Sequence, residues 1–293
     1  MMGETLLTID KALRDAAEAL RASGVREARR EAASLLSHAL ARERTFLITH
    51  ADERLTAEQL HTYLSLVERR ASGEPLQYIK GSQEFYGLDF EVTPDVLIPR
   101  PETELLVETA LEILKGTDSP LVCDVGTGSG CIAVSLLRTR PDARAVALDV
   151  SPPALEVAAR NAARNGVADR ITFLLSDCFD ALASGEHGET RFDLVASNPP
   201  YIAEDDLEGL QREVRDHEPR GALTPGGDGL SVIRRLVSDA PRHLKPGGHL
   251  LMEIGFDQHE SVAALIDARV WTLLGIRRDL QGIPRTVALR LAS

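Results

Sequence analysis

The sequence has few cysteines, and none of the three forms a CxxC pair. Cys123, Cys131 and Cys178 lie in or beside apolar runs, which favours reduced, partly buried thiols in a cytosolic protein over a disulfide-linked secreted one. The eight histidines form no HxxxH or Cys/His cluster, so we expect no metal site. No apolar run reaches the roughly 18 residues of a membrane span, and the acidic N-terminus lacks the apolar core of a signal peptide. These absences predict a cytoplasmic protein that does not enter a membrane.

An excess of positive charge is also missing, because the formal net charge is -12. Binding to nucleic acid needs a basic face that neutralises phosphates, so we expect no direct nucleic-acid partner. The 293 residues suit one large or two modest domains, and 43% of them are hydrophobic, which is enough for a sizeable core.

The N-terminal quarter of the chain is expected to be helical. Between residues 8 and 72, apolar side chains recur at helix spacing over 13–20 and 32–40. Thr56 and Gln59 match a capping box that opens a third helix, and Gly73 fits the position that follows its end. We expect residues 1–75 to form a small helical domain that docks a protein substrate.

The pattern changes between residues 76 and 100. Alternating apolar residues, interrupted by Gly87 and Pro94, predict a β-hairpin linker. Pro101 suits the first position of the next helix. Residues 101–293 are expected to form a second domain.

Apolar runs and helical patterns alternate through this second domain, which predicts an α/β fold with a mostly parallel sheet. Ligands of such sheets bind at the carboxyl ends of the strands. The stretch 181–191 is expected to be a connecting loop. The expected strands are 121–125, 145–150, 171–175, 192–196 and 249–254, with a turn at 245–248 before the last, and the expected helices are 132–137 and 152–165.

A glycine-rich loop follows the first of these strands. It consists of Gly126, Thr127, Gly128, Ser129 and Gly130. Glycines let the backbone turn sharply and let a ligand approach without Cβ contacts, although a plain strand-to-helix turn would use them too. The G-x-G-x-G spacing differs from that of dinucleotide-binding folds.

Acidic residues end the next two strands. Asp149 lies about 20 residues after the glycine loop, where a ribose-binding acid is expected. Ser151 and Pro152 already supply a cap for the following helix, so Asp149 is predicted to bind a ligand. Asp177 could accept a hydrogen bond from an adenine amino group, with Cys178 and Phe179 forming a wall beside the ring.

The most specific motif is Asn198-Pro199-Pro200-Tyr201, at the end of the fourth strand. Asn198 offers a side-chain carbonyl and Pro199 a backbone carbonyl, while consecutive prolines stiffen the chain. Such an edge can hold both hydrogens of a planar –NH2 group and direct its lone pair at a methyl group. Tyr201 can pack on the flat face of the acceptor.

Together these motifs resemble the bacterial release-factor glutamine methyltransferases, the HemK/PrmC family. The similarity spans nearly the whole chain. The most restrictive segment is Leu97-Ile98-Pro99-Arg100-Pro101-Glu102-Thr103-Glu104, because Asn-Pro-Pro-Tyr is shared with adenine-amino DNA methyltransferases. Other matching segments are 74–79, 85–87, 124–130 and 226–230.

The resemblance implies a class I (Rossmann-like) methyltransferase domain with a seven-stranded, mostly parallel sheet behind a small helical domain. It implies S-adenosylmethionine as cofactor and the glutamine of the Gly-Gly-Gln loop of peptide chain release factors as methyl acceptor, with a monomeric enzyme expected. By matching motifs, Gly126–Gly130, Asp149, Cys178 and Asn198 would contact the cofactor, and Asn198–Tyr201 the substrate. Several relatives carry an aromatic residue at Cys178, so Phe179 is expected to supply that surface instead. Arg100 would line the active site.

Four alternatives remain open on the residues. A methyltransferase for a ribosomal-protein glutamine fits the N-terminal region less well. An adenine-amino nucleic-acid methyltransferase conflicts with the acidic charge and with the lack of a basic recognition domain. A dinucleotide oxidoreductase conflicts with the glycine spacing. A non-catalytic cofactor-binding module would not need the complete Asn-Pro-Pro-Tyr motif.

Overall fold

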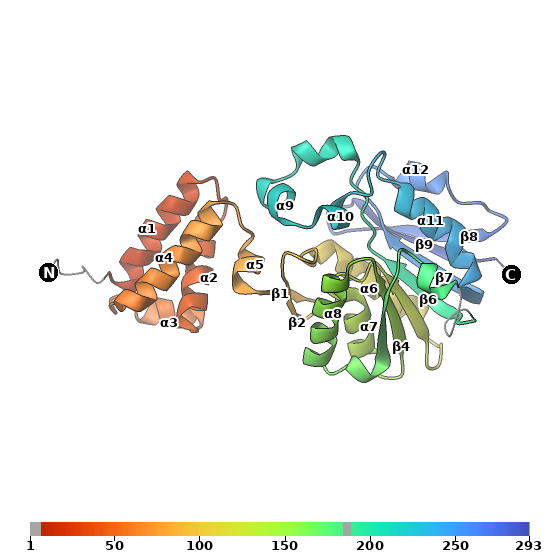
Figure 1. The fold of residues 1–293 in the computed structure, drawn as a ribbon, viewed down its shortest axis with the longest axis horizontal. Helices are drawn as coiled ribbons and strands as arrows, with labels where there is room; N and C mark the ends of the chain where they lie inside the picture. Colours follow the sequence, from red (N-terminus) through yellow and green to blue (C-terminus); the bar gives the residue numbers. More distant parts are fainter. Residues whose placement is uncertain (1–6, 184–188, 293) are drawn as a thin grey trace. The chain divides into compact units, whose positions relative to one another are not determined.

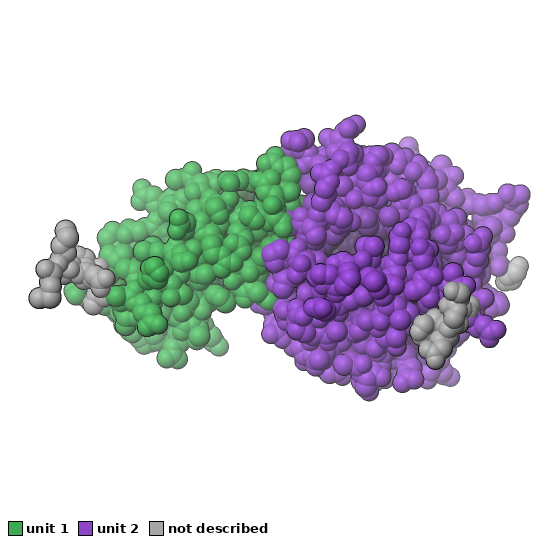
Figure 2. Space-filling model, viewed as in Figure 1, with its two compact units in different colours: residues 1–81, 211–217 green, residues 82–210, 218–293 purple. Residues whose placement is uncertain are grey.

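The structure, a computed structural model, describes residues 7–183 and 189–292. The chain forms two compact units, one of residues 1–81 with 211–217 and one of residues 82–210 with 218–293 (Figure 2). We call them unit 1 and unit 2. This division differs from the expected boundaries at 75 and 100, because helix α5 (Leu76–Lys80) packs on the helices of unit 1 and the hairpin contributes to the core of unit 2.

Unit 1 is helical, as the periodicity predicts. Its core contains Leu20, Leu35 and Leu36, packed around the buried ring of Tyr63. The predicted capping box is present at the start of α4: Gln59 N donates to Thr56 Oγ1, and Thr56 N donates to Gln59 Oε1. The helices of this unit are α1 (Ile9–Ala22), α2 (Ala28–Leu40), α3 (Arg44–Thr49), α4 (Ala57–Ala71), α5 and α9 (Arg212–His217).

A buried arginine joins α9 to the other helices of unit 1. The Arg70 side chain is 8% exposed, and its guanidinium lies 2.5 Å from Glu31 and 2.6 Å from Glu213. A buried charge is stable only when it is paired. This ion-pair network therefore explains why residues 211–217, far along the sequence, belong to unit 1.

Unit 2 begins with the predicted hairpin, β1 (Ser82–Phe85) paired antiparallel with β2 (Leu88–Glu91). A seven-stranded sheet follows, in the order β5-β4-β3-β6-β7-β9-β8. The first five of these strands pair in parallel, whereas β9 is antiparallel to both neighbours. The predicted mostly parallel α/β sheet is confirmed. Its strands are β3 (Leu121–Val125), β4 (Arg144–Asp149), β5 (Ile171–Leu175), β6 (Phe192–Ser197), β7 (Leu244–Glu253), β8 (Trp271–Arg278) and β9 (Pro284–Leu291).

Helices cover both faces of this sheet (Figure 1). Alternate strand residues point to opposite faces. Val122 and Ala147 pack in the cluster that contains α6, α7 and α8, while Cys123 and Leu148 pack in the cluster that contains α11 and α12. The helices of unit 2 are α6 (Glu104–Ile113), α7 (Cys131–Thr139), α8 (Pro152–Arg164), α10 (Arg220–Leu223), α11 (Ser231–Asp239) and α12 (His259–Ala263), and a 3-10 turn, Pro101–Thr103, precedes α6.

The predicted turn at residues 245–248 differs from the structure. These residues lie inside β7, where the register with β6 shifts between Phe192↔Leu244 and Leu194↔His249. Gly248 is packed closely, because a Cβ there would lie 2.9 Å from the Lys245 carbonyl oxygen. The turn is thus a bulge within one strand, which pairing with β6 holds in the sheet.

Part of the connecting loop expected at 181–191, residues 184–188, lies outside the described residues. Over residues 7–183 and 189–292, no helix is long and apolar enough to cross a membrane.

Candidate active site

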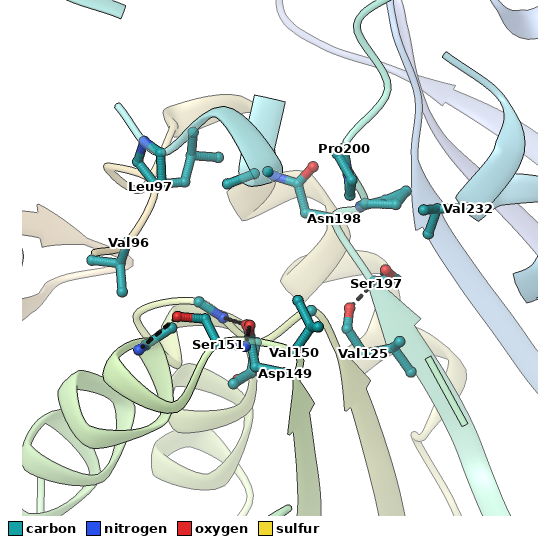
Figure 3. A pocket seen from close by; sticks show the side chains of 18 of the residues that line it. Val96, Leu97, Val125, Asp149, Val150, Ser151, Ser197, Asn198, Pro200 and Val232 are labelled. Atoms are coloured by element: carbon teal, nitrogen blue, oxygen red, sulfur yellow. Dashed lines mark hydrogen bonds between the residues drawn. The ribbon is translucent and has the colours of Figure 1, made fainter. Parts of the chain in front are cut away.

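A cavity of about 580 Å³ lies at the carboxyl ends of β3, β4, β5 and β6 in unit 2. This is the edge where ligands of parallel sheets are expected to bind, and the volume suits a small-molecule ligand. Figure 3 shows Asn198 and Pro200 on one side of this cavity and Asp149, Val150 and Ser151 on the other. The fold therefore brings the glycine loop, Asp149 and the Asn-Pro-Pro motif to one place.

The glycine loop turns directly after β3. Gly126 and Gly128 have φ angles of 72° and 54°, in the left-handed region that favours glycine. A Cβ at either position would meet nothing within 4 Å, and both residues line the cavity together with Thr127 and Ser129. The backbone is thus open to a ligand at these two glycines.

Gly130 has a different role from the other loop residues. It does not line the cavity. A Cβ on Gly130 would lie 3.2 Å from the Ala158 Cβ of α8. The predicted cofactor contact is therefore replaced by a packing role, since this glycine lets α7 start close to α8.

Asp149 ends β4 and is nearly buried. Its Oδ2 accepts a hydrogen bond from Gly128 N at 2.8 Å, and its Oδ1 accepts one from Ser151 N at 2.9 Å. Burial raises the pKa of this carboxyl, and the backbone N–H groups of Gly128, Ser151 and Val150 act against that rise. An ionised carboxylate offers about four lone-pair sites, so Asp149 can hold the glycine loop and still accept from a ligand hydroxyl. The predicted cap is also present, because Ser151 Oγ accepts from Ala154 N.

Of the three residues predicted to form the adenine site after β5, Asp177 and Cys178 line the cavity and Phe179 does not. Asp177 lines the cavity, but its Oδ1 lies 2.7 Å from Arg235 Nη1 and its side chain is 59% exposed. Cys178 also lines the cavity and has a φ of 48°. The chain turns at this residue, so that the side chain of Phe179 points into the core.

Phe179 does not supply the expected wall of the adenine site. Its ring is buried and stacks on His243, with centroids 4.9 Å apart and an interplanar angle of 19°. It does not line the cavity. Val150, which is 68% exposed and does line the cavity, offers an apolar surface beside Asp149 instead.

The Asn-Pro-Pro motif forms the wall opposite Asp149. Asn198, Pro199 and Pro200 line the cavity. The Asn198 Nδ2 donates to Thr103 Oγ1 at 3.1 Å. Among the described residues, none donates a hydrogen bond to Asn198 Oδ1, which remains an acceptor for a ligand.

Tyr201 is placed differently from the prediction. It does not line the cavity, and its hydroxyl donates to Glu253 Oε1 at 3.3 Å. Its carbonyl accepts from Gln258 Nε2 at 2.8 Å. The ring therefore supports the motif and does not form the predicted flat surface for the acceptor.

Arg100 lines the cavity as predicted, and its Nη2 lies 2.5 Å from the buried carboxylate of Glu218. This ion pair connects the segment before α6 with the segment before α10. The positive charge of Arg100 is thus fixed in the cavity wall by a buried partner.

Sequence reasoning missed two buried acids, Asp124 and Glu253. Asp124 is the last but one residue of β3 and accepts from Thr127 Oγ1 at 2.7 Å; burial raises its pKa to about 6. Glu253 ends β7 and accepts from Thr103 Oγ1 at 2.7 Å; burial raises its pKa to about 7. The available signal was an acid at the end of an apolar run, the same signal that identified Asp149. Within the described parts of the chain, no group of three or more His, Cys, Asp or Glu could hold a metal ion.

Comparisons with known proteins agree with this arrangement. Residues 11–81 match the family described as PrmC N-terminal domain, and residues 101–228 match the family described as Methyltransferase small domain. A methyltransferase structure from Pyrococcus furiosus is 17% identical with a TM-score of 0.50, covering 71% of this chain and 91% of that one. A 16S rRNA methyltransferase of T. thermophilus, solved with AdoMet and guanosine, is 21% identical with a TM-score of 0.50, covering 72% of this chain and 49% of that one. Both show the methyltransferase fold.

Curated relatives match the chain over nearly its whole length. The release factor glutamine methyltransferase of Burkholderia pseudomallei is 50% identical over 282 residues, 94% of this chain and 96% of that protein. The protein of the same name from Nitratidesulfovibrio vulgaris is 46% identical over 286 residues, 97% of this chain and 95% of that protein. Since the likeness includes both the helical region and the catalytic fold, the chain is a methyltransferase and belongs to the release factor glutamine methyltransferase family.

Proposed function

We propose that this enzyme transfers a methyl group from S-adenosylmethionine to the side-chain amide nitrogen, N5, of the glutamine in the Gly-Gly-Gln loop of peptide chain release factors. The observation that carries the proposal is the Asn198-Pro199-Pro200 edge, which lines the cavity opposite Asp149. The names of relatives at 50% and 46% identity support the same substrate. Release factors and ribosomal proteins would both be methylated in the cytoplasm, so location does not distinguish the two substrates. The match of residues 11–81 to the PrmC N-terminal domain favours release factors.

The cavity fits S-adenosylmethionine by the chemistry of its walls. The open backbone at Gly126 and Gly128 leaves room for the amino-acid end of the cofactor. The Asp149 carboxylate can accept from the ribose hydroxyls, and Val150 offers an apolar surface for the base. A neighbour with this fold was solved with AdoMet. When bound, the cofactor supplies an electrophilic methyl group on a sulfonium.

The Asn-Pro-Pro edge would hold the methyl acceptor. An amide nitrogen is a poor nucleophile, because its lone pair is delocalised into the carbonyl. Asn198 Oδ1 and the Pro199 carbonyl would accept from its two N–H groups, which favours the positive charge that develops on nitrogen and directs the lone pair toward the methyl group. The two prolines keep this edge rigid before the substrate binds, so little ordering is needed during the reaction.

No side-chain base is needed at the acceptor nitrogen, because the alkylated nitrogen becomes acidic and loses its proton readily. Glu253, the buried acid nearest the motif in the hydrogen-bond network, accepts from Thr103 and Tyr201 and does not line the cavity. Its carboxylate therefore acts on the neighbouring side chains and not on the substrate proton.

Residues 1–75 would dock the release factor. The described residues that line the cavity all belong to unit 2, so the helices of unit 1 are available for a different task. We infer that this unit distinguishes the protein substrate from free glutamine and from short peptides.

The proposal is tested by incubating the enzyme with labelled S-adenosylmethionine and purified release factor, then mapping the methylated residue. We expect label on the Gly-Gly-Gln glutamine. A release factor with alanine at that glutamine is the matched control and should take up no label. Label on a ribosomal protein or on duplex DNA, with none on the release factor, would establish one of the competing substrates.

A further inference from the structure

A hydrogen-bond network that starts at a buried carboxylate extends to the catalytic edge. Glu253 is 2% exposed and comes from the end of β7. Its Oε2 accepts from Thr103 Oγ1 at 2.7 Å, and its Oε1 accepts from Tyr201 Oη at 3.3 Å. Thr103 is 1% exposed, and its Oγ1 accepts from Asn198 Nδ2 at 3.1 Å. Glu253 and Thr103 thus connect the core to the amide group of Asn198 through hydrogen bonds.

The chemistry of these groups gives the network a direction. An ionised carboxylate only accepts hydrogen bonds, and a hydroxyl has a single proton to donate. Because the Thr103 proton goes to Glu253, the Thr103 oxygen can only accept from Asn198. The –NH2 end of the Asn198 amide must then face Thr103, so that its Oδ1 is the end left for a ligand.

We propose that Glu253, acting through Thr103, is a positioning residue that fixes the orientation of the Asn198 amide and keeps Oδ1 directed at the methyl acceptor. This inference rests on the proposed function, because it assigns the acceptor role to Asn198 Oδ1. With the amide turned around, its –NH2 group would meet the –NH2 group of the substrate. Two donors facing each other cannot bond, and the substrate nitrogen would lose the contact that stabilises its developing charge.

Protonation of Glu253 removes the constraint on which group donates and which accepts in each hydrogen bond of the network. Burial, with a smaller contribution from Glu102, raises the pKa of Glu253 to about 7, although the two hydroxyl donors and Arg285 act in the opposite direction. As pH falls through this value, a carboxylic acid replaces the carboxylate and can donate to Thr103. Thr103 is then free to donate to Asn198, so either orientation of the amide becomes possible. We expect methyl transfer to slow on the acid side of pH 7.

The activity test uses Thr103→Val and Thr103→Ser as a matched pair. Valine keeps the shape but removes the hydroxyl, whereas serine keeps the hydroxyl. We expect Thr103→Val to lower kcat by about 10–100-fold, less than the 10²–10³ typical of deleting a preorganised transition-state hydrogen bond. Thr103→Ser should stay close to the parent. The dissociation constant for S-adenosylhomocysteine should not change in either variant.

Two further arms separate positioning from a general effect on the fold. In Glu253→Gln, the fall in kcat below pH 7 should disappear, because the titrating group is gone. In an Asn198→Ala background, Thr103→Val should cause no further loss, since residues in one network are not additive. Losses that multiply in the double variant, or an acid limb that persists in Glu253→Gln, would overturn the proposal.

A readout that needs no substrate is also available, because the sequence contains three asparagines, Asn161, Asn165 and Asn198. Labelling asparagine with 15N gives three pairs of side-chain amide signals, and Asn198→Ala identifies the pair of interest. Thr103→Val should shift this pair and speed its hydrogen exchange by up to about tenfold, the worth of one hydrogen bond. An unchanged pair would refute the network. Failure of the proposed function is recognised separately, as a parent enzyme that does not methylate release factor.

Discussion

Replacing Asp149 should weaken cofactor binding without harming the fold. Its carboxylate accepts from Gly128 N at 2.8 Å and from Ser151 N at 2.9 Å, so Asp149→Ala would also release the glycine loop. Asp149→Asn is the sharper change, because a side-chain carbonyl remains for one of the two N–H groups. Hydrogen bonds to a charged group contribute about 1.5–3 kcal/mol. This corresponds to a dissociation constant for S-adenosylhomocysteine that rises about 10- to 150-fold.

The pKa of Asp149 predicts the effect on stability. Burial raises this pKa in the folded protein, so the folded state is favoured by protonation, and that contribution is lost as pH rises through the folded pKa. At neutral pH the ionised carboxylate therefore costs stability in the absence of a ligand. Removing the charge in Asp149→Asn should leave Tm unchanged or slightly higher, while ligand binding weakens.

Calorimetric titration with S-adenosylhomocysteine and a thermal unfolding curve test both parts on the same sample. Asp177→Asn is the matched control, because Asp177 lines the same cavity but is exposed and paired with Arg235. It should change affinity much less. The ribose assignment is refuted if Asp149→Asn binds as tightly as the parent. A purely structural role would instead lower Tm and affinity together.

Other perturbations test the catalytic edge, the docking unit and the packing behind the motif. Asn198→Ala should lower single-turnover methyl transfer by about 10²–10³-fold with little change in Tm, and Asn198→Asp should fall between alanine and the parent; an alanine variant as fast as the parent would make Asn198 a structural residue. Deleting residues 1–75 should preserve binding of S-adenosylhomocysteine by calorimetry and abolish methylation of intact release factor; normal turnover by the folded truncation would contradict docking. Gly229→Ala should lower Tm and slow methyl transfer, because its Cβ would lie 2.3 Å from the Tyr201 carbonyl oxygen at a φ of 76°, at a cost of about 1–3 kcal/mol; Gly209→Ala, whose Cβ meets nothing within 4 Å, is the control and should be neutral.

Local chemistry in the sequence was sufficient for much of the fold. The capping box of Thr56 and Gln59 depends only on residues three apart, and the structure confirms both of its hydrogen bonds. The alternation of apolar runs and helices predicts a parallel sheet, whose strands bring their carboxyl ends to one edge. That rule alone placed the glycine loop, Asp149 and Asn198 around one cavity.

Side-chain direction and long-range pairing, by contrast, were decided only by the tertiary structure. Phe179 turns to His243 because Cys178 adopts a left-handed φ of 48°, which no local pattern around it indicates. Thr103 and Glu253 meet across 150 positions of sequence, since the 3-10 turn before α6 lies beside the end of β7. A buried carboxylate must find donors wherever the fold supplies them. The sequence therefore determined that the glycine loop, Asp149 and the Asn-Pro-Pro edge meet at one cavity. The tertiary structure determined that Phe179 and Tyr201 turn away from it and that Glu253 and Thr103 stand behind Asn198.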